Sequence, residues 1–408
     1  MTKKASTPAL RFKGFTYTWK QRKLSDQFSD FIVPMRDKPK KFGGNIPWTR
    51  IEDIEGKYLN GSLSGQFVSK DTIKQMNLKI IPKDSLIVSS SATFGVVAII
   101  TQDLITNQTF IGLVPNDKET LDFWYTFFHS NEARNYMRLQ SAGSTIFYIA
   151  REHFEKMPII IPFKDEMITI GKYFSNLDRL ITLHQRKYDK LTNMKKSMLE
   201  KMFPKNGANV PEIRFKGFTD AWKQRKLGEA VQEVTRNDAT SDAPIMMITA
   251  NNGFIEQSER YAFNNAGESL KKYILLEKGE LAYNHGASKL RPYGSCFTLT
   301  TSENARIPFV YHCFSADEQN SEFLSIELNG ADVENQLRRI VSSGARMDGL
   351  LNISFQEYVS VSVLLPTIEE QNKIADFFKN LDNLITLHQR ELEKLKNLKK
   401  ACLEKMFV

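Results

Sequence analysis

The chain has 408 residues, more than one ordinary hydrophobic core accommodates, which predicts two or three domains. Its hydrophobic share of 41% and charged share of 25% are typical of a folded protein, and a net charge of +9 favours an acidic partner such as nucleic acid. Three cysteines without CxxC or CxxH spacing argue against a disulfide framework or a zinc finger. No apolar run is long enough to span a membrane, so we expect a cytoplasmic protein without a membrane partner.

A basic, aromatic segment opens each half of the chain. RFKGFTYTWKQRKL at 11–24 returns as RFKGFTDAWKQRKL at 214–227, with 12 of 14 positions identical. Basic side chains alternate with Phe12, Phe15 and Trp19 in the first copy. Two interpretations stay open: the segment grips DNA phosphates while its rings anchor it, or it is the first segment of a domain with a solvated basic face.

The segments that follow, 25–140 and 228–340, show no clear similarity to each other. Both contain short strand-like runs separated by turns, and both contain a helical region, at 121–139 and 321–340. Each segment therefore predicts a mixed α/β (α+β) domain of about 150 residues.

Similarity returns at 141–162 and 342–366, where a glycine-centred polar loop leads into a strand that a proline closes. It is strongest at 176–203 and 380–407, which agree at 20 of 28 positions. Neither of these two copies contains Gly or Pro, so each predicts a continuous long helix.

A heptad seam runs along each long helix, with its residues alternately four and three positions apart. The seam residues expected to pair are Leu177, Ile181, His184 and Leu191 in the first helix and Leu381, Ile385, His388 and Leu395 in the second. Two matching seams favour an antiparallel coiled coil, which gives the chain a pseudo-two-fold internal repeat and separates two globular domains by roughly 60 Å. The other interpretation is that each helix packs on its own domain.

The two seam histidines, His184 and His388, lie near mid-helix, where the pseudo-two-fold axis would pass. They are either satisfied structural residues or a polar pair that sets the register, and a metal site there lacks further ligands. Apolar residues outside the seam, such as Leu183 and Leu387, face the domains or a partner protein.

The predicted organisation has five parts. A first globular domain at 1–162 is followed by the first long helix at 163–203 and a Pro- and Gly-containing linker at 204–211. A second globular domain at 212–366 and the second long helix at 367–408 complete the chain.

Motifs for catalysis are missing from the sequence. It has no Walker loop, no GxGxxG and no Asn-Pro-Pro-aromatic motif of adenine methyltransferases. Asp37, Glu55 and Lys57 match the metal-binding pattern of nucleases only loosely, and the six histidines are scattered. The sequence therefore indicates a binding protein with no catalytic residue and no metal site.

Small polar and basic residues in predicted loops form the candidate DNA-binding set, because Asn, Gln, Ser and Arg side chains can read base edges in the major groove. In the first domain these are Ser89, Ser90, Ser91, Thr93, Asn107, Gln108, Gly143, Ser144 and Thr145. In the second domain they are Asn284, His285, Ser288, Lys289, Arg291, Ser343, Gly344 and Arg346. Each of them is also compatible with an ordinary loop residue.

Taken together, these features resemble the DNA-specificity subunit of type I restriction–modification enzymes. The most specific strings are GGNIPWTRIEDI at 43–54, SSSATFG at 89–95, TNQ at 106–108 and PTIEEQNKIADFFKNLDNLI at 366–385. The first helix departs from the family pattern, since it reads KDEMITIGKYF where the second reads IEEQNKIADFF.

This resemblance implies two target-recognition domains, each reading one half of a split, asymmetric site in double-stranded DNA. The helices would dock two modification subunits that carry S-adenosylmethionine and methylate adenine, and two restriction subunits that use ATP and magnesium would complete the complex. This chain itself would hold no cofactor. Two rival classes remain: a coiled-coil scaffold without DNA readout, and a stand-alone DNA-modifying enzyme.

Overall fold

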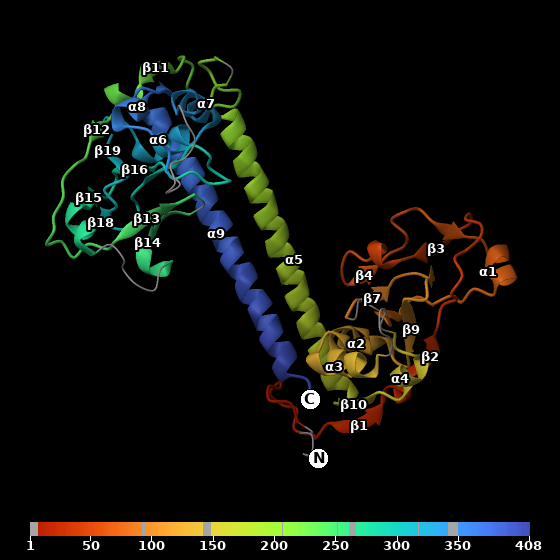
Figure 1. Cartoon of the computed structure of the whole chain (residues 1–408). Helices are drawn as coiled ribbons and strands as arrows, with labels where there is room; N and C mark the ends of the chain where they lie inside the picture. Colours follow the sequence, from red (N-terminus) through yellow and green to blue (C-terminus); the bar gives the residue numbers. More distant parts are fainter. Residues whose placement is uncertain are drawn as a thin grey trace. The chain divides into compact units, whose positions relative to one another are not determined.

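The computed structural model describes residues 7–91, 95–141, 148–205, 207–250, 252–260, 267–316, 318–341 and 350–408. The chain forms two compact units, which are described one at a time (Figure 1). Unit 1 comprises Met1–Lys187 and His388–Val408, and unit 2 comprises Tyr188–Leu387.

Two helices of 38 residues each, α5 (Lys164–Lys201) and α9 (Ile368–Lys405), belong to both units. Unit 1 holds the first part of α5 and the last part of α9, and unit 2 holds the other two parts. Each unit is therefore built from segments that lie far apart in the sequence.

The two helices pair within unit 1. The Lys399 Nζ atom lies 2.5 Å from Asp178 Oδ1, and His388 Nδ1 lies 3.2 Å from His184 Nδ1. As the residue number increases along α5, the number of its partner on α9 decreases, so the paired segments are antiparallel.

The same direction holds in unit 2. Lys195 Nζ lies 2.5 Å from Asp382 Oδ1, and the ring centroids of Phe203 and Phe378 are 6.2 Å apart. The predicted antiparallel pairing is confirmed in each unit. Of the predicted seam, Leu177 and Leu381 are buried, and the half-buried positions are Ile181, His184, Leu191, Ile385, His388 and Leu395.

A five-stranded main sheet forms the centre of unit 1. Its strand order is β2-β9-β6-β7-β4, and all neighbours are antiparallel except β4 and β7. The strands are β2 (Phe28–Ile32), β9 (Phe110–Pro115), β6 (Leu86–Ser89), β7 (Val97–Ile100) and β4 (Tyr58–Leu59). Leu86 and Val88 of β6 enter the largest core cluster while Ile87 enters another, because alternate side chains of a strand point to opposite faces.

A smaller sheet, called here the accessory sheet, adds to unit 1. It has the order β5-β3-β8 and comprises β5 (Phe67–Val68), β3 (Ile46–Thr49) and β8 (Ile105–Thr106). Together with α1 (Lys70–Met76) it surrounds its own core of Trp48, Val68, Leu78 and Ile105.

Unit 2 has a four-stranded main sheet with the order β12-β19-β16-β17. Its strands are β12 (Gln232–Glu233), β19 (His312–Ser315), β16 (Leu281–Asn284) and β17 (Ser295–Thr298). Two further pairs, β13 (Met246–Thr249) with β14 (Gly253–Glu256) and β15 (Ile274–Glu277) with β18 (Asn304–Ile307), pack around a separate core that includes Ile248 and Leu276.

The two main sheets share one plan although their sequences do not align. The order β2-β9-β6-β7 of unit 1 corresponds to β12-β19-β16-β17 of unit 2, with the same chain sequence and antiparallel pairing. A sheet requires alternating apolar residues rather than particular ones, so the plan survives where residue identity does not. The mixed α/β prediction is confirmed in both units.

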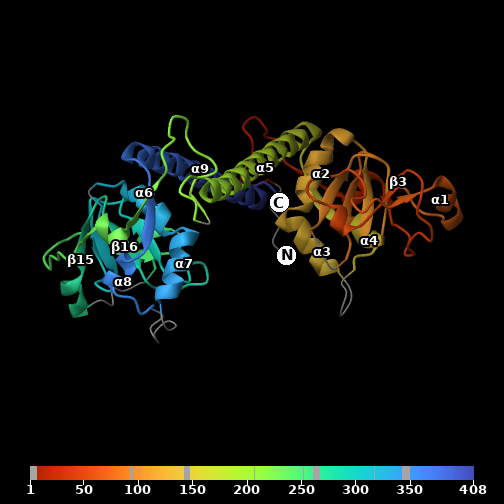
Figure 2. The same ribbon diagram turned by 90° about the horizontal axis from the view of Figure 1, so that it is seen from above.

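Each predicted helical region of the middle segments divides into two helices. In unit 1 these are α2 (Leu121–Phe128) and α3 (Asn131–Gln140), and in unit 2 they are α6 (Ser321–Leu328) and α7 (Ala331–Ile340). The break in unit 1 arises because Ser130 caps α3, with its side chain accepting a hydrogen bond from Ala133 N. In unit 1, α2 lies between the first part of α5 and the main sheet (Figures 1 and 2).

The remaining elements are short. The helices α4 (Arg151–Glu155) and α8 (Phe355–Val359) precede β10 (Pro158–Ile161) and β20 (Ser362–Leu365), respectively. The 3₁₀ turns are Leu24–Asp26, Ile51–Asp53, Lys118–Thr120, Leu227–Glu229, Gln257–Glu259 and Gly267–Lys272.

The repeated basic, aromatic segment has a structural role in both units. Its KQRK strands, β1 (Lys20–Lys23) and β11 (Lys223–Lys226), pair with β10 and β20 and expose all four residues. The leading arginines point inward: Arg11 contacts Glu166 at 2.6 and 2.7 Å, and Arg214 contacts Glu370 at 2.7 Å through two nitrogens. These two arginines hold the first turn of α5 and α9 and are not free for DNA phosphates.

The C-terminal end of each long helix completes the core of the unit that holds the N-terminal end of the other long helix. Phe407, just beyond α9, lies against Phe123 and Phe174 of unit 1 at centroid distances of 5.7 and 6.2 Å. Phe203, just beyond α5, lies against Phe323 of unit 2 at 5.7 Å. The equivalent aromatic clusters explain why the sequence ending in KMF is repeated.

Candidate nucleic-acid interface

In unit 1 the candidate segments converge at the end of β6. Ser91 forms an isolated antiparallel bridge with Tyr148, and Ile149 N donates to Ser90 O at 2.8 Å. Ser90 N in turn donates to Thr109 O at 2.8 Å. The segments around 89–91, 107–109 and 148–149 therefore meet at one place, which we call the loop junction of unit 1.

Unit 2 has the same junction at the end of β16. Gly286 bridges Leu350, and Leu351 N donates to His285 O at 2.9 Å. His285 and Gly286 thus occupy the places of Ser90 and Ser91. Seven residues of the candidate DNA-binding set lie outside the described residues: Thr93, Gly143, Ser144, Thr145, Ser343, Gly344 and Arg346.

The described candidates of unit 1 differ in exposure. Ser89 and Ser90 are buried, and Ser89 Oγ donates to Ser91 O at 3.2 Å. Ser91 and Asn107 are half-buried, and Asn107 Oδ1 accepts hydrogen bonds from the backbone and side chain of Thr109. Gln108 is exposed. In this arrangement the serines shape the junction, while Gln108 presents its amide to solvent.

In unit 2, His285 is buried and its ring nitrogens are both engaged by the backbone. Nδ1 lies 2.8 Å from Leu351 O and Nε2 lies 2.7 Å from Val310 O. Asn284 is half-buried and is held by Ile248 O and Gly286 N at 3.0 and 2.9 Å. Both residues therefore hold the junction in place through hydrogen bonds to backbone atoms.

The exposed candidates of unit 2 are Ser288 and Lys289. Ser288 Oγ accepts a hydrogen bond from Arg291 N at 3.0 Å, which closes the turn that carries Lys289. Arg291 is half-buried, and its Nη1 donates to Asn329 O at 2.8 Å. Its guanidinium is thus held at the C-terminal end of α6.

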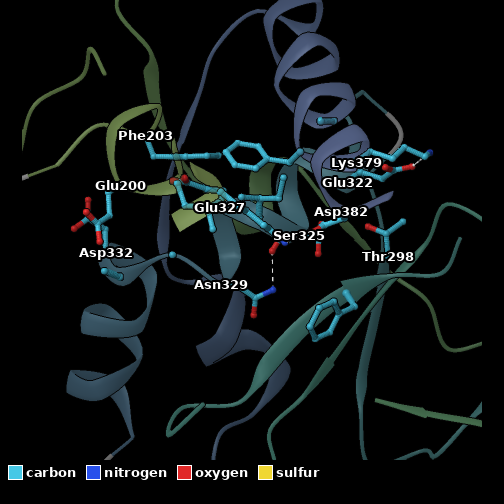
Figure 3. A pocket seen from close by; sticks show the side chains of 18 of the residues that line it. Glu200, Phe203, Thr298, Glu322, Ser325, Glu327, Asn329, Asp332, Lys379 and Asp382 are labelled. Carbon is cyan, nitrogen blue, oxygen red and sulfur yellow. Dashed lines mark hydrogen bonds and ion pairs between the residues drawn. The ribbon is translucent and has the colours of Figure 1, made fainter. Parts of the chain in front are cut away.

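Arg291 also lines a cavity of about 860 Å³ within unit 2. Figure 3 shows that Glu327, Asn329 and Ser325 reach this cavity from α6 and its C-terminal end, with Phe203 and Lys379 on other walls. Burial raises the pKa of Glu327 to about 7, and one of its oxygens accepts from Leu364 N at 3.1 Å. Glu327 is the seventh residue of α6, whereas the seventh residue of α2 in unit 1 is Phe127, which belongs to the apolar core.

Sequence reasoning missed one basic residue that lies close to the unit 1 junction in space. Exposed Arg134 of α3 approaches Gly95 so closely that a Cβ there would meet its Nε at 3.2 Å. Gly95 follows the 89–91 segment, so Arg134 reaches the unit 1 junction from a separate helix. Its sequence neighbours indicate only a helix surface, and no local signal reveals this proximity.

Among the described residues, no three His, Cys, Asp or Glu side chains gather as metal ligands. No helix within the described ranges has the length and apolar character required to cross a bilayer.

The two units have one plan, each with a polar loop junction and with segments of both antiparallel helices, so the chain is a tandem protein of two related units. The chain belongs to the family described as Type I restriction modification DNA specificity domain, which matches residues 18–193 and 220–397. The resemblance inferred from the sequence is thereby confirmed, and the role of the chain is DNA specificity.

Relatives and a solved structure agree with this assignment. The chain is 22% identical to the Type I restriction enzyme MjaVIII specificity subunit of Methanocaldococcus jannaschii, over 90% of each protein. It is 24% identical to the MjaIX specificity subunit of the same organism, over 55% of this chain and 54% of that relative, about half its length. The crystal structure of a type I restriction–modification S subunit from M. genitalium has the same fold, with a TM-score of 0.59 at 15% identity over 98% of this chain and 99% of that one.

Proposed function

We propose that this chain recognises a bipartite, asymmetric site in double-stranded DNA, with one half-site read by each unit through the major groove. One observation carries the proposal: the two loop junctions have the same backbone connections but different residues. Ser90 and Ser91 in unit 1 correspond to His285 and Gly286 in unit 2. The exposed residues beside these junctions also differ, with Gln108 in unit 1 and Ser288 and Lys289 in unit 2, and base edges are distinguished by the side chains presented to them.

The candidate contacts are ordered by their exposure. Gln108 in unit 1 and Ser288 and Lys289 in unit 2 are exposed and can meet base edges or phosphates directly. Arg134 adds a guanidinium beside Gly95. The buried serines and His285 act in this proposal by holding the loops in place.

The long helices serve in this proposal as spacer and as docking surface. Leu183 and Leu398 in unit 1 and Leu384 and Leu387 in unit 2 are 43% to 51% exposed and provide apolar surface for a partner protein. Two modification subunits that carry S-adenosylmethionine would cover these leucines. Two restriction subunits with ATP and magnesium would complete the assembly, and this chain would contribute no catalytic residue.

The test is to map methylated adenines in cells that express this chain with its partners. A second chain carries four extra residues in both α5 and α9, at equivalent positions, which lengthens the spacer by about 6 Å. The expected result is the same two half-sites with a gap longer by about two base pairs, given a rise of 3.4 Å.

Changed half-sites at an unchanged gap would contradict the spacer role. Absence of methylation that depends on this chain, or methylation by the purified chain alone, would contradict the specificity role itself.

A further inference from the structure

The segment of unit 1 that contains β3 and β5 of the accessory sheet has an excess of positive charge. The segment between β2 and β6, residues 33–85, has ten Lys or Arg and six Asp or Glu. The corresponding segment of unit 2, residues 234–280, has five Lys or Arg and seven Asp or Glu. The two units therefore differ in charge as well as in structure outside their common main sheet.

The charge gathers in one exposed stretch next to α1. Within residues 35–44, the exposed basic residues are Arg36, Lys38, Lys40 and Lys41, and the one acid is Asp37. Lys40 N lies 3.5 Å from Met76 Sδ, which places the stretch against α1. We call this stretch, together with exposed Lys70 and Lys74 of α1, the accessory basic patch.

An aromatic platform orders the patch. Lys38 Nζ lies 5.4 Å from the ring centroid of Phe42 and 5.7 Å from that of Trp48, and the two rings are 5.6 Å apart. The Arg50 guanidinium lies 5.6 Å from Trp48 on the same platform. Cation–π contacts hold these charges at fixed places, and Phe42 itself remains 40% exposed.

The patch adjoins the unit 1 loop junction through the accessory sheet. Trp48 and Thr49 of β3 pair in parallel with Ile105 and Thr106 of β8. Arg50 is thus the next residue after Thr49 just as the candidate Asn107 is the next after Thr106. Since neighbouring strands lie about 4.8 Å apart, the platform borders the segment that contributes Asn107 and Gln108.

We propose that the accessory basic patch binds the phosphate backbone of the duplex beside the half-site read by unit 1. This inference rests on the proposed DNA recognition and adds a second, sequence-independent contact at unit 1. Lysines on an exposed loop suit phosphates, whose charge they neutralise with release of counterions. Base reading stays with the loop junction, so the patch sets affinity without changing the recognised sequence.

Two adjacent lysine pairs provide a matched test. Lys40→Gln with Lys41→Gln removes two charges from the patch, and Lys271→Gln with Lys272→Gln removes two from the corresponding region of unit 2. All four lysines are exposed, so the folded chain should be retained in both variants. Binding of the full chain to a fluorescent duplex of mixed sequence is measured across a salt series.

The expected result is a smaller salt dependence for the first variant. The slope of log K against log salt should fall in magnitude by about 1.8, or 0.9 for each lost phosphate contact. The second variant should keep the slope of the unaltered chain. With partner subunits present, the methylated sequence should be the same for all three chains.

An unchanged slope in the first variant, or equal losses in both, would overturn the patch assignment. A changed methylated sequence would also overturn it, because phosphate contacts carry no base information. Weaker assembly with partner subunits at an unchanged slope would assign the patch to an acidic protein surface instead. Failure of the unaltered chain to bind duplex DNA would contradict the proposed function, which is a separate outcome.

Discussion

Removal of Arg214 tests whether its buried pair with Glu370 fixes the start of α9. The Glu370 side chain is fully buried and Arg214 is 12% exposed, with two nitrogen–oxygen contacts of 2.7 Å. Arg214→Ala leaves a buried carboxylate without its cation, and removal of one partner from a buried pair costs about 3–5 kcal/mol. Unit 2 should therefore lose much of its stability.

The equivalent substitution in unit 1 should cost less. Glu166 also accepts a hydrogen bond from Trp19 Nε1 at 3.3 Å, so Arg11→Ala leaves it one donor. In unit 2, the corresponding nitrogen of Trp222 is buried and makes no hydrogen bond. A hydrogen bond to a charged group contributes roughly 1.5 kcal/mol, which is the difference expected between the two variants.

Calorimetry and hydrogen exchange together measure this prediction. Arg214→Ala should lower the transition of unit 2 by about 10 °C, at 2–4 °C for each kcal/mol, and should speed amide exchange in the first turns of α9. Arg225→Ala is the control, since Arg225 is exposed on β11 in the same segment and should change stability by about 0.5 kcal/mol or less. A loss below about 1 kcal/mol for Arg214→Ala, or an equal loss for Arg11→Ala, would refute the buried-charge reasoning.

Three further substitutions test local features. Burial raises the pKa of Glu327 to about 7, so the folded chain holds this proton up to a higher pH than the unfolded chain does. The stability that the bound proton contributes is complete below about pH 4.5 and lost above about pH 7. Glu327→Gln should therefore raise stability by about 1–3 kcal/mol in denaturant titrations at pH 8 and change it little at pH 4.5. Gly171→Ala should destabilise unit 1 by about 1–3 kcal/mol in the same titration, because a Cβ there would meet Phe123 N at 2.6 Å. Burial and the neighbouring His184 lower the pKa of His388, so on acidification the unfolded chain binds this proton before the folded chain does. Lowering the pH from 7.5 to 5.5 should therefore destabilise the pairing of His184 with His388. His388→Gln should reduce this dependence of stability on pH in thermal melts.

The tandem plan and the antiparallel pairing were predictable because they leave direct marks on the sequence. Repeated residues such as Leu177 and Leu381 keep one period over many turns, and that period specifies both the helix and its buried face. The common strand order of the two main sheets was not predictable. Strands demand only a pattern of apolar residues, which the unlike middle segments satisfy with different side chains.

The candidate site was predictable in outline and not in its contacts. The sequence identified Ser90, His285 and the segments near them, and the two loop junctions bring these segments together. It did not reveal that His285 is tied to two backbone carbonyls, or that Arg291 turns toward Asn329. Those contacts depend on residues far apart along the chain, for which one sequence holds no local signal.

The role of Arg11 illustrates the same limit and also explains the repeat. A basic residue among aromatics is compatible with phosphate binding, yet Arg11 is bound to Glu166 across 155 positions. Each copy of the segment holds a helix start, through Arg11 in unit 1 and Arg214 in unit 2. The repeated residues thus hold the long helices in place, whereas the two loop junctions are formed by residues that differ between the units.

This separation has a consequence for how the two units can diversify. The residues that hold the helices, such as Arg214, Glu370 and Phe203, lie at the helix ends, whereas the junction residues His285 and Gly286 lie at the end of a central strand. Substitutions at a junction leave the buried ion pair and the aromatic cluster intact, so their stability costs should simply add to those of substitutions at the helix ends, as expected for sites without shared contacts. In the proposed recognition of two half-sites, such a chain would change the half-site read by one unit while it keeps the frame that holds the other.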